Sequence, residues 1–376
     1  MSSHFQHTPS QSPDATRNLY RSLFLDSTPL LDVRAPIEFI KGAIPLATNL
    51  PLLDDDERRR VGTAYKQHGQ QAAIELGHRL VGGEIKEQRV EAWKQWQKAH
   101  PQGWLYCFRG GLRSQIAQQW LADAGVQTPR VPGGYKALRQ FLTETIDDVS
   151  QTRPFVVVAG PTGSGKTALL RALTASADLE GLAGHRGSAF GSQLSGQPEQ
   201  INFENALAIR FLQLTTLDAG VWYLEDESKA IGSLSVPHRL YEAMRRSPLA
   251  LIRAPLETRT NTILNDYIRE NLREFQERDP VLGFNRFSQY LLGSLSRIQR
   301  RLGGDRYQEV VADMQDALRI QAESGDTDAH AVWIVKLLQH YYDPMYAYQL
   351  SKRQATISFE GSGEEFLAWA QVPATA

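Results

Sequence analysis

The chain has 376 residues, a formal net charge of −1 and a single cysteine. Its length favours two domains over one hydrophobic core, and its near-neutral charge restricts any nucleic-acid site to a local basic patch. One cysteine excludes an internal disulfide framework and a zinc site built from several cysteines, and it fits a reducing cytosol. We therefore expect a cytoplasmic protein.

The N-terminal residues predict neither targeting nor membrane insertion. Residues 1–16 lack the charged and then apolar order of a signal peptide, and they predict a disordered tail. No apolar run approaches the roughly 20 residues that span a bilayer, so no membrane partner is expected.

Short apolar strands alternate with charged helices in the first part of the chain. Strands are expected at 30–34, within 42–51 and at 104–106, and helices at 54–70 and 84–100. This alternation predicts an α/β fold with a parallel sheet. Because ligands bind at the carboxyl ends of such strands, the residues just after 106 are the expected site.

The only cysteine stands at that strand end, in the segment CFRGGLRS at 107–114. The amides of a glycine-rich turn and of the helix that follows favour an anion, and two nearby arginines favour the thiolate. A buried structural cysteine is the alternative, but it would not need two glycines and two arginines in the next six positions. The candidate residues are the catalytic Cys107, Arg109 and Arg113, and the anion loop Gly110, Gly111 and Ser114.

Several short motifs before this loop resemble those of a single rhodanese domain, over residues 17–145. They lie at 32–34, 38–39, 42–45 and 49–51. The resemblance implies that Cys107 carries a chalcogen atom as a persulfide or perselenide.

The chain departs from that family at two places. Residues 54–90 form a helical insertion, and Arg113 follows Cys107 by six positions, one more than in the usual sulfurtransferase loop. The same spacing, C-x5-R, resembles the cysteine-based phosphatases. We expect the longer loop to suit a phosphate-sized anion.

The next segment predicts a boundary between two domains. A turn at 131–136, a helix at 138–149 and a linker at 151–154 follow the cysteine loop. We therefore expect a rhodanese-like parallel-sheet domain at 17–150. A P-loop NTPase-like α/β domain with a helical C-terminal part is expected at 151–376.

An apolar strand at 155–159 runs into GPTGSGKT at 160–167, with a helix expected at 168–175. This matches G-x-x-x-x-G-K-[ST] between a strand and a helix, a motif whose amides and lysine hold a diphosphate or triphosphate. A P-loop that has lost its ligand is the alternative. The candidate phosphate-binding residues are Gly160, Gly163, Ser164, Gly165, Lys166 and Thr167.

A second buried strand at 221–224 ends in acidic residues. Asp226 is the first candidate for holding Mg²⁺ or its water and Glu225 the second, although a solvated acidic strand end would look the same. A third strand is expected at 249–252. The P-loop would serve a prenyl diphosphate as well as ATP, since the motif binds phosphates and not a base.

The helical C-terminal part contains a basic stretch at 286–307, with five arginines against one acid. Arginines contact RNA phosphates, and the interleaved Phe287, Tyr290 and Tyr307 could stack on bases. A solvated face of an amphipathic helix is the alternative. The candidate tRNA-binding residues are Arg286, Arg297, Arg300, Arg301 and Arg306.

The order of the motifs resembles the bacterial tRNA 2-selenouridine synthases over residues 17–360. Besides the cysteine loop and the P-loop, the resemblance includes GGYK at 133–136, EDES at 225–228 and YYDPMY at 341–346. The aromatic residues of the last motif suit either core packing or a wall of the base or prenyl site.

This resemblance implies a two-step reaction on wobble 2-thiouridine in tRNAs for Lys, Glu and Gln. Geranyl diphosphate first alkylates the sulfur, and selenium from selenophosphate then replaces the geranylthio group. It implies no tightly bound cofactor and a separate synthetase that supplies selenophosphate, and it leaves a need for Mg²⁺ open.

Three other functions stay open at this point. One is an ATP-dependent tRNA sulfurtransferase, and another is a C-x5-R phosphatase fused to a kinase-like domain. The third is a nucleotide-gated RNA-binding module with a vestigial rhodanese domain.

Overall fold

The computed structural model describes residues 12–371 and divides the chain into two compact units. The first unit contains the described residues up to 146 together with Glu199–Thr215, and the second contains the remaining described residues. We predicted that 199–215 would belong to the second domain, and the structure corrects this point.

Residues 1–11 of the predicted tail lie outside the described residues. For residues 13–16 the prediction of disorder is wrong, because helix α1 (Pro13–Leu25) begins there. The side chain of Ser12 caps this helix by accepting a hydrogen bond from the amide of Ala15.

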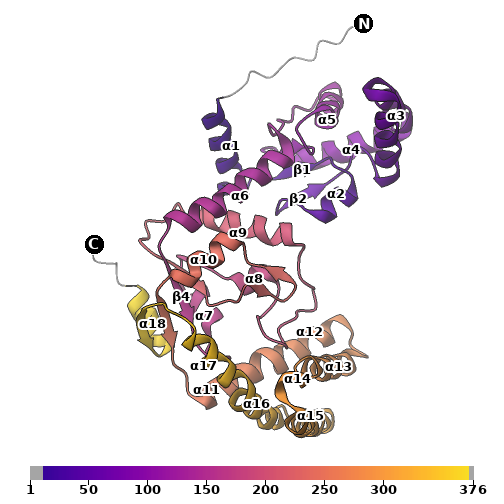
Figure 1. Ribbon diagram of the computed structural model, residues 1–376. Coiled ribbons are helices and arrows are strands. Elements are labelled where there is room, and N and C mark those ends of the chain that lie inside the picture. Colours follow the sequence, from indigo (N-terminus) through magenta and orange to yellow (C-terminus); the bar gives the residue numbers. More distant parts are fainter. Residues whose placement is uncertain (1–11, 372–376) are drawn as a thin grey trace. The chain divides into compact units, whose positions relative to one another are not determined.

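The first unit has a three-stranded parallel sheet in the order β2-β1-β3. Figure 1 labels β1 and β2 of this sheet. The helices predicted at 54–70 and 84–100 are present as α3, which begins with a capping box at Asp54 and Glu57, and α4. A non-helical Gly69 kinks α3, and a second helical segment continues after the kink to Leu80, ten residues beyond the predicted end. The elements are α1, β1 (Leu30–Asp32), α2 (Pro36–Lys41), β2 (Ala47–Asn49), α3 (Asp55–Leu80), α4 (Gly83–Ala99), β3 (Trp104–Tyr106), α5 (Leu112–Asp123), α6 (Gly134–Thr152) and α9 (Gln200–Leu214).

Helix α9 is the late segment that packs in the first unit. Its Asn205 is fully buried, and the Nδ2 of that side chain donates a hydrogen bond to the carbonyl of Ala43 at 2.7 Å. The Asn202 side chain accepts from the amide of Ala43 at 2.8 Å. These contacts are non-local, and no local pattern in the sequence predicts them.

The second unit has a five-stranded parallel sheet in the order β10-β9-β4-β6-β5. Its centre is β4 (Phe155–Ala159), in which all five residues are buried. The edge strand β10 (Ile357–Gly361) comes from near the C-terminus and was not predicted. The other elements around the sheet are α7 (Lys166–Arg171), β5 (Ser176–Ala177), α8 (Leu179–Ala183), β6 (Trp222–Glu225), β7 (Ala230–Ile231), β8 (Leu234–Ser235), α10 (His238–Arg246), β9 (Leu249–Ile252) and α18 (Gly363–Ala370).

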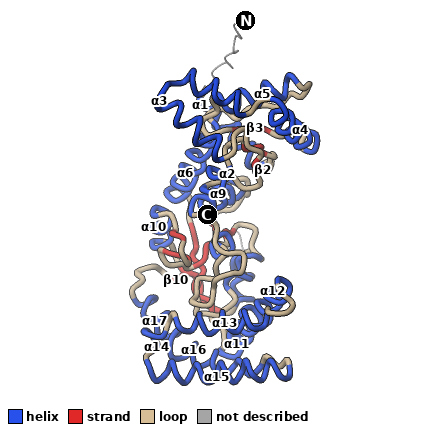
Figure 2. The backbone as a smooth tube through the Cα atoms, turned by 90° about the vertical axis from the view of Figure 1, so that its right-hand side faces the viewer, coloured by secondary structure: helices blue, strands red, loops and turns tan. Residues whose placement is uncertain are grey.

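Helices between β9 and β10 form the helical part of the second unit, which gathers apart from the strands in Figure 2. Two of its segments, η1 and η3, are π-helical. The two parallel sheets and this helical part confirm the predicted class of fold, which is α/β with parallel sheets and a helical C-terminal part. These helices are α11 (Leu256–Ile263), η1 (Leu264–Arg269), α12 (Glu270–Arg278), α13 (Gly283–Ser296), α14 (Gln299–Leu302), α15 (Gly304–Ser324), η2 (Asp328–His330), α16 (Ala331–Leu337), η3 (Leu338–Tyr342) and α17 (Asp343–Ser351). Across residues 12–371, no helix combines the length and the apolar character needed to cross a membrane.

The core of this helical part contains a fully buried histidine, His330. Its Nε2 lies 2.9 Å from the Gln321 side-chain oxygen, and its Nδ1 accepts a hydrogen bond from the Trp333 indole at 2.9 Å. Burial lowers the pKa of His330 to about 4, although Asp326 opposes the shift. The ring is therefore neutral in the folded protein at neutral pH.

Acid is expected to destabilise the fold through His330. Between its ordinary pKa of about 6.5 and the folded value of about 4, only the unfolded chain takes up the proton, so stability falls as the pH falls. From pH 7 to pH 5 this costs about 2 kcal/mol. Denaturant unfolding at both pH values should show the wild type losing that much more stability than His330→Gln. Equal losses in the two proteins would contradict the prediction.

Candidate functional site

The cysteine loop follows β3 directly, and Cys107 is 3% exposed. Its Sγ lies 3.2 Å from Ser114 Oγ, and the Ser114 hydroxyl donates to the carbonyl of Gly111 at 2.9 Å. The Ser114 oxygen thus accepts from the thiol, and a rotated hydroxyl would donate to a thiolate. The structure therefore places Cys107 and Ser114 together, as the loop motif predicts.

The first turn of α6 holds this loop in place. The amides of Tyr135 and Lys136 donate to the carbonyls of Cys107 and Phe108, each at 2.9 Å. Gly134 has a φ of +61°, and a Cβ there would lie 2.3 Å from the Cys107 carbonyl oxygen. Only glycine fits this position without moving the loop. The second half of the turn predicted at 131–136 is thus the start of helix α6, which supports the site.

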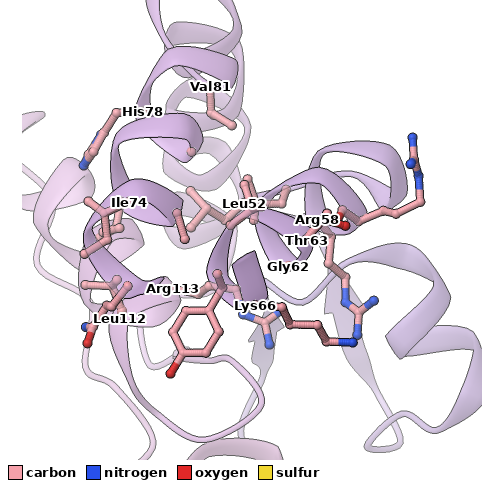
Figure 3. Close-up of a pocket in the computed structure, with 18 of the residues that line it drawn as sticks. Leu52, Arg58, Gly62, Thr63, Lys66, Ile74, His78, Val81, Leu112 and Arg113 are labelled. Carbon is pink, nitrogen blue, oxygen red and sulfur yellow. The ribbon is translucent and has the colours of Figure 1, made fainter. Parts of the chain in front are cut away.

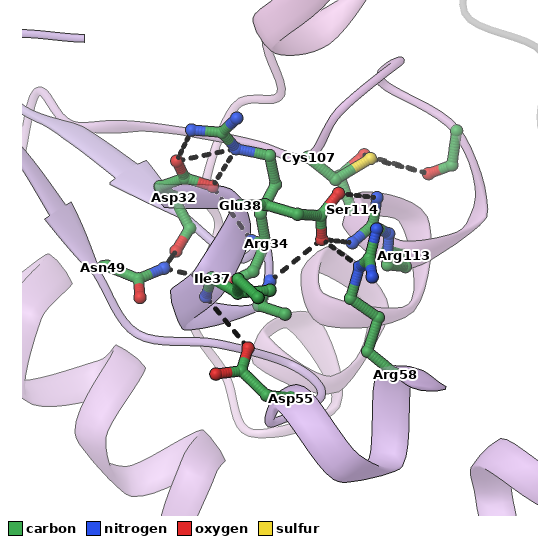
Figure 4. Close-up of polar contacts among 12 residues, drawn as sticks. Asp32, Arg34, Ile37, Glu38, Asn49, Asp55, Arg58, Cys107, Arg113 and Ser114 are labelled. Carbon is green, nitrogen blue, oxygen red and sulfur yellow. Dashed lines mark hydrogen bonds and ion pairs between the residues drawn. The ribbon is translucent and has the colours of Figure 1, made fainter. Parts of the chain in front are cut away.

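Arg113 is held by an acidic partner. Its guanidinium donates to both carboxylate oxygens of Glu38, at 2.6 and 3.2 Å, and Arg58 Nε lies 2.9 Å from the same carboxylate (Figure 4). Burial raises the pKa of Glu38, but Arg113 and then Arg58 outweigh it and hold the pKa below its ordinary value. Glu38 therefore stays ionised and fixes Arg113 at the start of α5.

Two other arginines belong to the cysteine loop or contact it. Arg109 is exposed, with its guanidinium 5.9 Å from the Phe108 ring centroid. Arg130 is not among the residues that the sequence motifs indicate. It donates to the carbonyl of Gly110 at 2.8 Å, burial lowers its pKa, and the charge of Cys107 opposes that shift. Arg130 lies 23 positions after Cys107, so no local pattern could have indicated it.

The P-loop connects β4 to α7, as predicted, although α7 ends at Arg171 and is shorter than expected. Lys166 Nζ lies 2.8 Å from the carbonyl of Gly160. At Gly163 the φ is +82°, and a Cβ would lie 2.7 Å from the Arg259 carbonyl oxygen. Glycine is required here because the loop passes so close to α11.

A group of glutamates, the buried Glu225 and the half-buried Glu180 and Glu227, lies beside the P-loop hydroxyl. Thr167 Oγ1 donates to Glu225 Oε1 at 2.9 Å and lies 3.3 Å from Glu180 Oε2. Burial, and then the charges of Glu180 and Asp178, raise the pKa of Glu225 to about 8. Burial also raises the pKa of Glu227, which is hydrogen-bonded to Glu180. A cation placed here would relieve the repulsion among these carboxylates.

The structure reverses the order of the two acidic candidates at the end of β6. Glu225 contacts Thr167, whereas Asp226 forms an ion pair with the buried Arg353. The preference for Asp226 is therefore not supported by the geometry. Among the described residues, no group of three His, Cys, Asp or Glu side chains is arranged to hold a metal ion.

The C-terminal part of the chain matches a known family. Residues 153–375 match the family model described as "tRNA 2-selenouridine synthase AAA domain". A tRNA 2-selenouridine synthase from Bordetella petrii is 52% identical over 361 residues, which is 96% of each chain. The chain belongs to the tRNA 2-selenouridine synthase family.

Other relatives cover the chain as fully. Synthases from Pseudomonas fluorescens and Shewanella loihica are 49% and 48% identical, over 93% and 95% of this chain and 96% of each relative. These alignments span both units, so the cysteine loop and the P-loop belong to one tRNA 2-selenouridine synthase architecture.

In the basic stretch at 286–307 of this tRNA 2-selenouridine synthase family member, some arginines already bind other residues of the chain. Arg286 pairs with Asp279 at 3.1 Å, and Arg297 donates to Ser294 and to the carbonyl of Ala189. Arg297 and Arg300 line a surface hollow of about 410 Å³. Within the basic stretch at 286–307, the exposed arginines that show no ion pair with another described residue are Arg300, Arg301 and Arg306.

The aromatic residues in that stretch pack in or against the hydrophobic core of the helical part. Phe287 is fully buried, and Tyr290 and Tyr307 pack against the same hydrophobic cluster. Their predicted stacking on bases is wrong for Phe287. Tyr341 and Tyr342 are also in this core cluster.

Asp343, which belongs to the YYDPMY motif at 341–346, is connected to the P-loop through Arg259. It binds both terminal nitrogens of Arg259, at 3.0 and 2.5 Å, and Arg259 Nε donates to the P-loop carbonyl of Thr162 at 2.8 Å. The motif thus supports the phosphate-binding loop.

Proposed function

We propose that the chain converts wobble 2-thiouridine in tRNA to 2-selenouridine, by geranyl transfer followed by selenium transfer. Family membership supports the overall conversion. The observation that supports the division into two steps is the presence of two separate glycine-containing loops, each following a strand, one around Cys107 and one around Lys166. One suits a phosphate-sized donor and the other a diphosphate.

In the first step, the thiocarbonyl sulfur attacks C1 of geranyl diphosphate. A C–S bond forms, the C–O bond breaks, diphosphate leaves and the N3 proton is lost to solvent. The P-loop amides and Lys166 stabilise the charge on the leaving diphosphate. If Mg²⁺ takes part, the oxygens of Thr167 and Glu225 are the ligands that this chain offers, and the ion would neutralise the diphosphate.

In the second step, the selenium of selenophosphate attacks C2 of the alkylated base. The C2–S bond breaks, and geranylthiolate leaves and takes up a proton. Alkylation makes this possible because a thiocarbonyl sulfur alone is a poor leaving group. The P–Se bond then breaks as the Cys107 thiolate accepts the phosphoryl group, and the base regains its N3 proton from solvent. Water then hydrolyses the phosphorylated cysteine, which releases phosphate and restores the thiolate.

This route differs from the one that the rhodanese resemblance implies, in which Cys107 carries selenium as a perselenide. Selenium in selenophosphate is already at the oxidation level of selenide, and it keeps that level in 2-selenouridine. A perselenide would require the loss of two electrons to an oxidant that nothing in the proposed reaction provides. Nucleophilic attack on phosphorus also agrees with the C-x5-R spacing of the loop.

Reconstitution with purified protein tests the proposed function. Thiolated tRNA and geranyl diphosphate, without ATP, should give S-geranyl-2-thiouridine in the digested nucleosides, and added selenophosphate should convert it to 2-selenouridine. Mass spectrometry checks both products. A reaction that needs ATP and yields no geranyl adduct would rule out the first step.

Reversing the charge of Arg300 and Arg301 should weaken tRNA binding. Each is an exposed cation on α14, and losing phosphate contacts reduces both affinity and its salt dependence. We expect an affinity loss of at least about ten-fold for Arg300→Glu with Arg301→Glu. Filter binding or fluorescence anisotropy at two salt concentrations measures it.

The matched control exchanges Arg273 and Arg319 for glutamate. Both are exposed, but each forms ion pairs within its own helix. Equal affinities for the two double variants would remove the argument for the α14 arginines.

A further inference from the structure

The first unit contains a cavity of about 700 Å³ that the proposed mechanism does not use. Helix α3 and the start of α5 line it. Small-molecule sites commonly have volumes of about 300–1,000 Å³ with mainly apolar walls. The cavity has such walls, since five of its lining residues are apolar and at most 8% exposed: Leu52, Leu53, Ala73, Val81 and Trp120.

Most of the wall comes from the helical insertion. Gly62, Ala73 and Ile74 of α3 line the cavity. A Cβ at Gly62 would meet no atom within 4 Å, so the space beside this residue is open. The insertion, which a minimal rhodanese-like module would lack, therefore builds an apolar binding space.

This cavity adjoins the cysteine loop. Leu112 and Arg113, at the start of α5, lie in its wall. Cys107 belongs to the same hydrophobic cluster as Leu52 and Trp120. A group bound in the cavity would therefore lie against the helix that leaves the catalytic loop.

The cavity also has cationic side chains: Arg58, Arg59, Lys66 and Arg113. In Figure 3, Ile74 and Leu112 lie on one side, and Arg58 and Lys66 on the other. Arg58 and Arg113 share Glu38, and Arg59 pairs with Asp56. Within residues 12–371, exposed Lys66 shows no ion pair. Apolar walls beside cations suit a hydrocarbon chain attached to a polyanion.

We propose that this cavity binds the geranyl chain of S-geranyl-2-thiouridine in tRNA, and that the Cys107 loop thereby selects the alkylated base over 2-thiouridine. The inference rests on the proposed two-step function. A ten-carbon isoprenoid is apolar enough for the walls, and the phosphates next to the wobble nucleotide match Lys66 and Arg59. Selection is needed because only the alkylated sulfur can leave.

Two synthetic anticodon hairpins test this directly, one with S-geranyl-2-thiouridine and one with 2-thiouridine. The full-length protein should bind the geranylated hairpin at least ten-fold more tightly. Gly62→Leu, which fills the cavity, and Ile74→Asp, which makes it polar, should remove that preference. Gln71→Leu should retain it, because Gln71 is exposed on the same helix outside the cavity lining.

Equal binding of the two hairpins, or a preference that survives both cavity variants in folded protein, would overturn the proposal. Geranyl diphosphate alone provides a second arm. If it displaces the geranylated hairpin and both cavity variants abolish geranyl transfer, the cavity is the donor site and the proposal is wrong. Because the hairpins are made chemically, binding is measured even if the chain transfers no geranyl group, so the two proposals fail separately.

Discussion

Replacing Cys107 by serine is expected to abolish selenium incorporation and to leave geranyl transfer intact. In the proposed mechanism the thiolate accepts the phosphoryl group, and loss of a nucleophile costs on the order of 10³-fold or more. The fold should be unaffected, because serine is no larger than the buried Cys107 and its hydroxyl could hydrogen-bond to Ser114. With all substrates present, the nucleosides should show accumulated S-geranyl-2-thiouridine.

Ser114→Ala is the companion variant, since Ser114 Oγ lies 3.2 Å from the thiol. It should slow selenium transfer by about ten-fold, the value of one hydrogen bond to a charged group. Wild-type selenation by Cys107→Ser would show that Cys107 is not the nucleophile. Loss of both steps in this variant would show that the two sites do not act separately.

Replacing Lys166 by alanine is expected to have the opposite effect. Lys166 is placed to neutralise a leaving diphosphate, and removing one such interaction costs on the order of 10²–10³-fold in rate. Geranyl transfer should fall by this factor, while tRNA that already carries the geranyl group should be selenated at the wild-type rate. Single-turnover assays of each step separate the two effects.

Lys352→Ala is the matched control for this variant, because Lys352 is an exposed lysine of the same unit. It should transfer the geranyl group at the wild-type rate. An unchanged geranyl-transfer rate in Lys166→Ala would contradict the assignment of the P-loop to the diphosphate donor.

The parts of both sites that are continuous in sequence could be predicted. The P-loop and the cysteine loop each lie at the end of a buried strand, and periodicity and glycine spacing indicate both. The strand at 249–252 was predicted with the bounds that β9 has. Such features depend on local conformational preference, which neighbouring residues determine.

Contacts between distant residues could not be predicted. Arg113 pairs with Glu38, which is 75 positions earlier, and Asp226 is held by Arg353, which is 127 positions later. A carboxylate beside a strand end looks the same in the sequence whether it contacts Thr167 or an arginine. The choice between Glu225 and Asp226 therefore required the tertiary structure.

The position of α9 affects how the protein can fold during synthesis. The first unit includes Glu199–Thr215, while residues 147–198 belong to the second. As the ribosome adds residues in order, the first unit remains incomplete until well after the P-loop has been made. Until then Ala43 lacks the Asn205 side chain that pairs with its carbonyl. A nascent chain ending near residue 150 therefore contains the whole cysteine loop but not the whole domain that supports it.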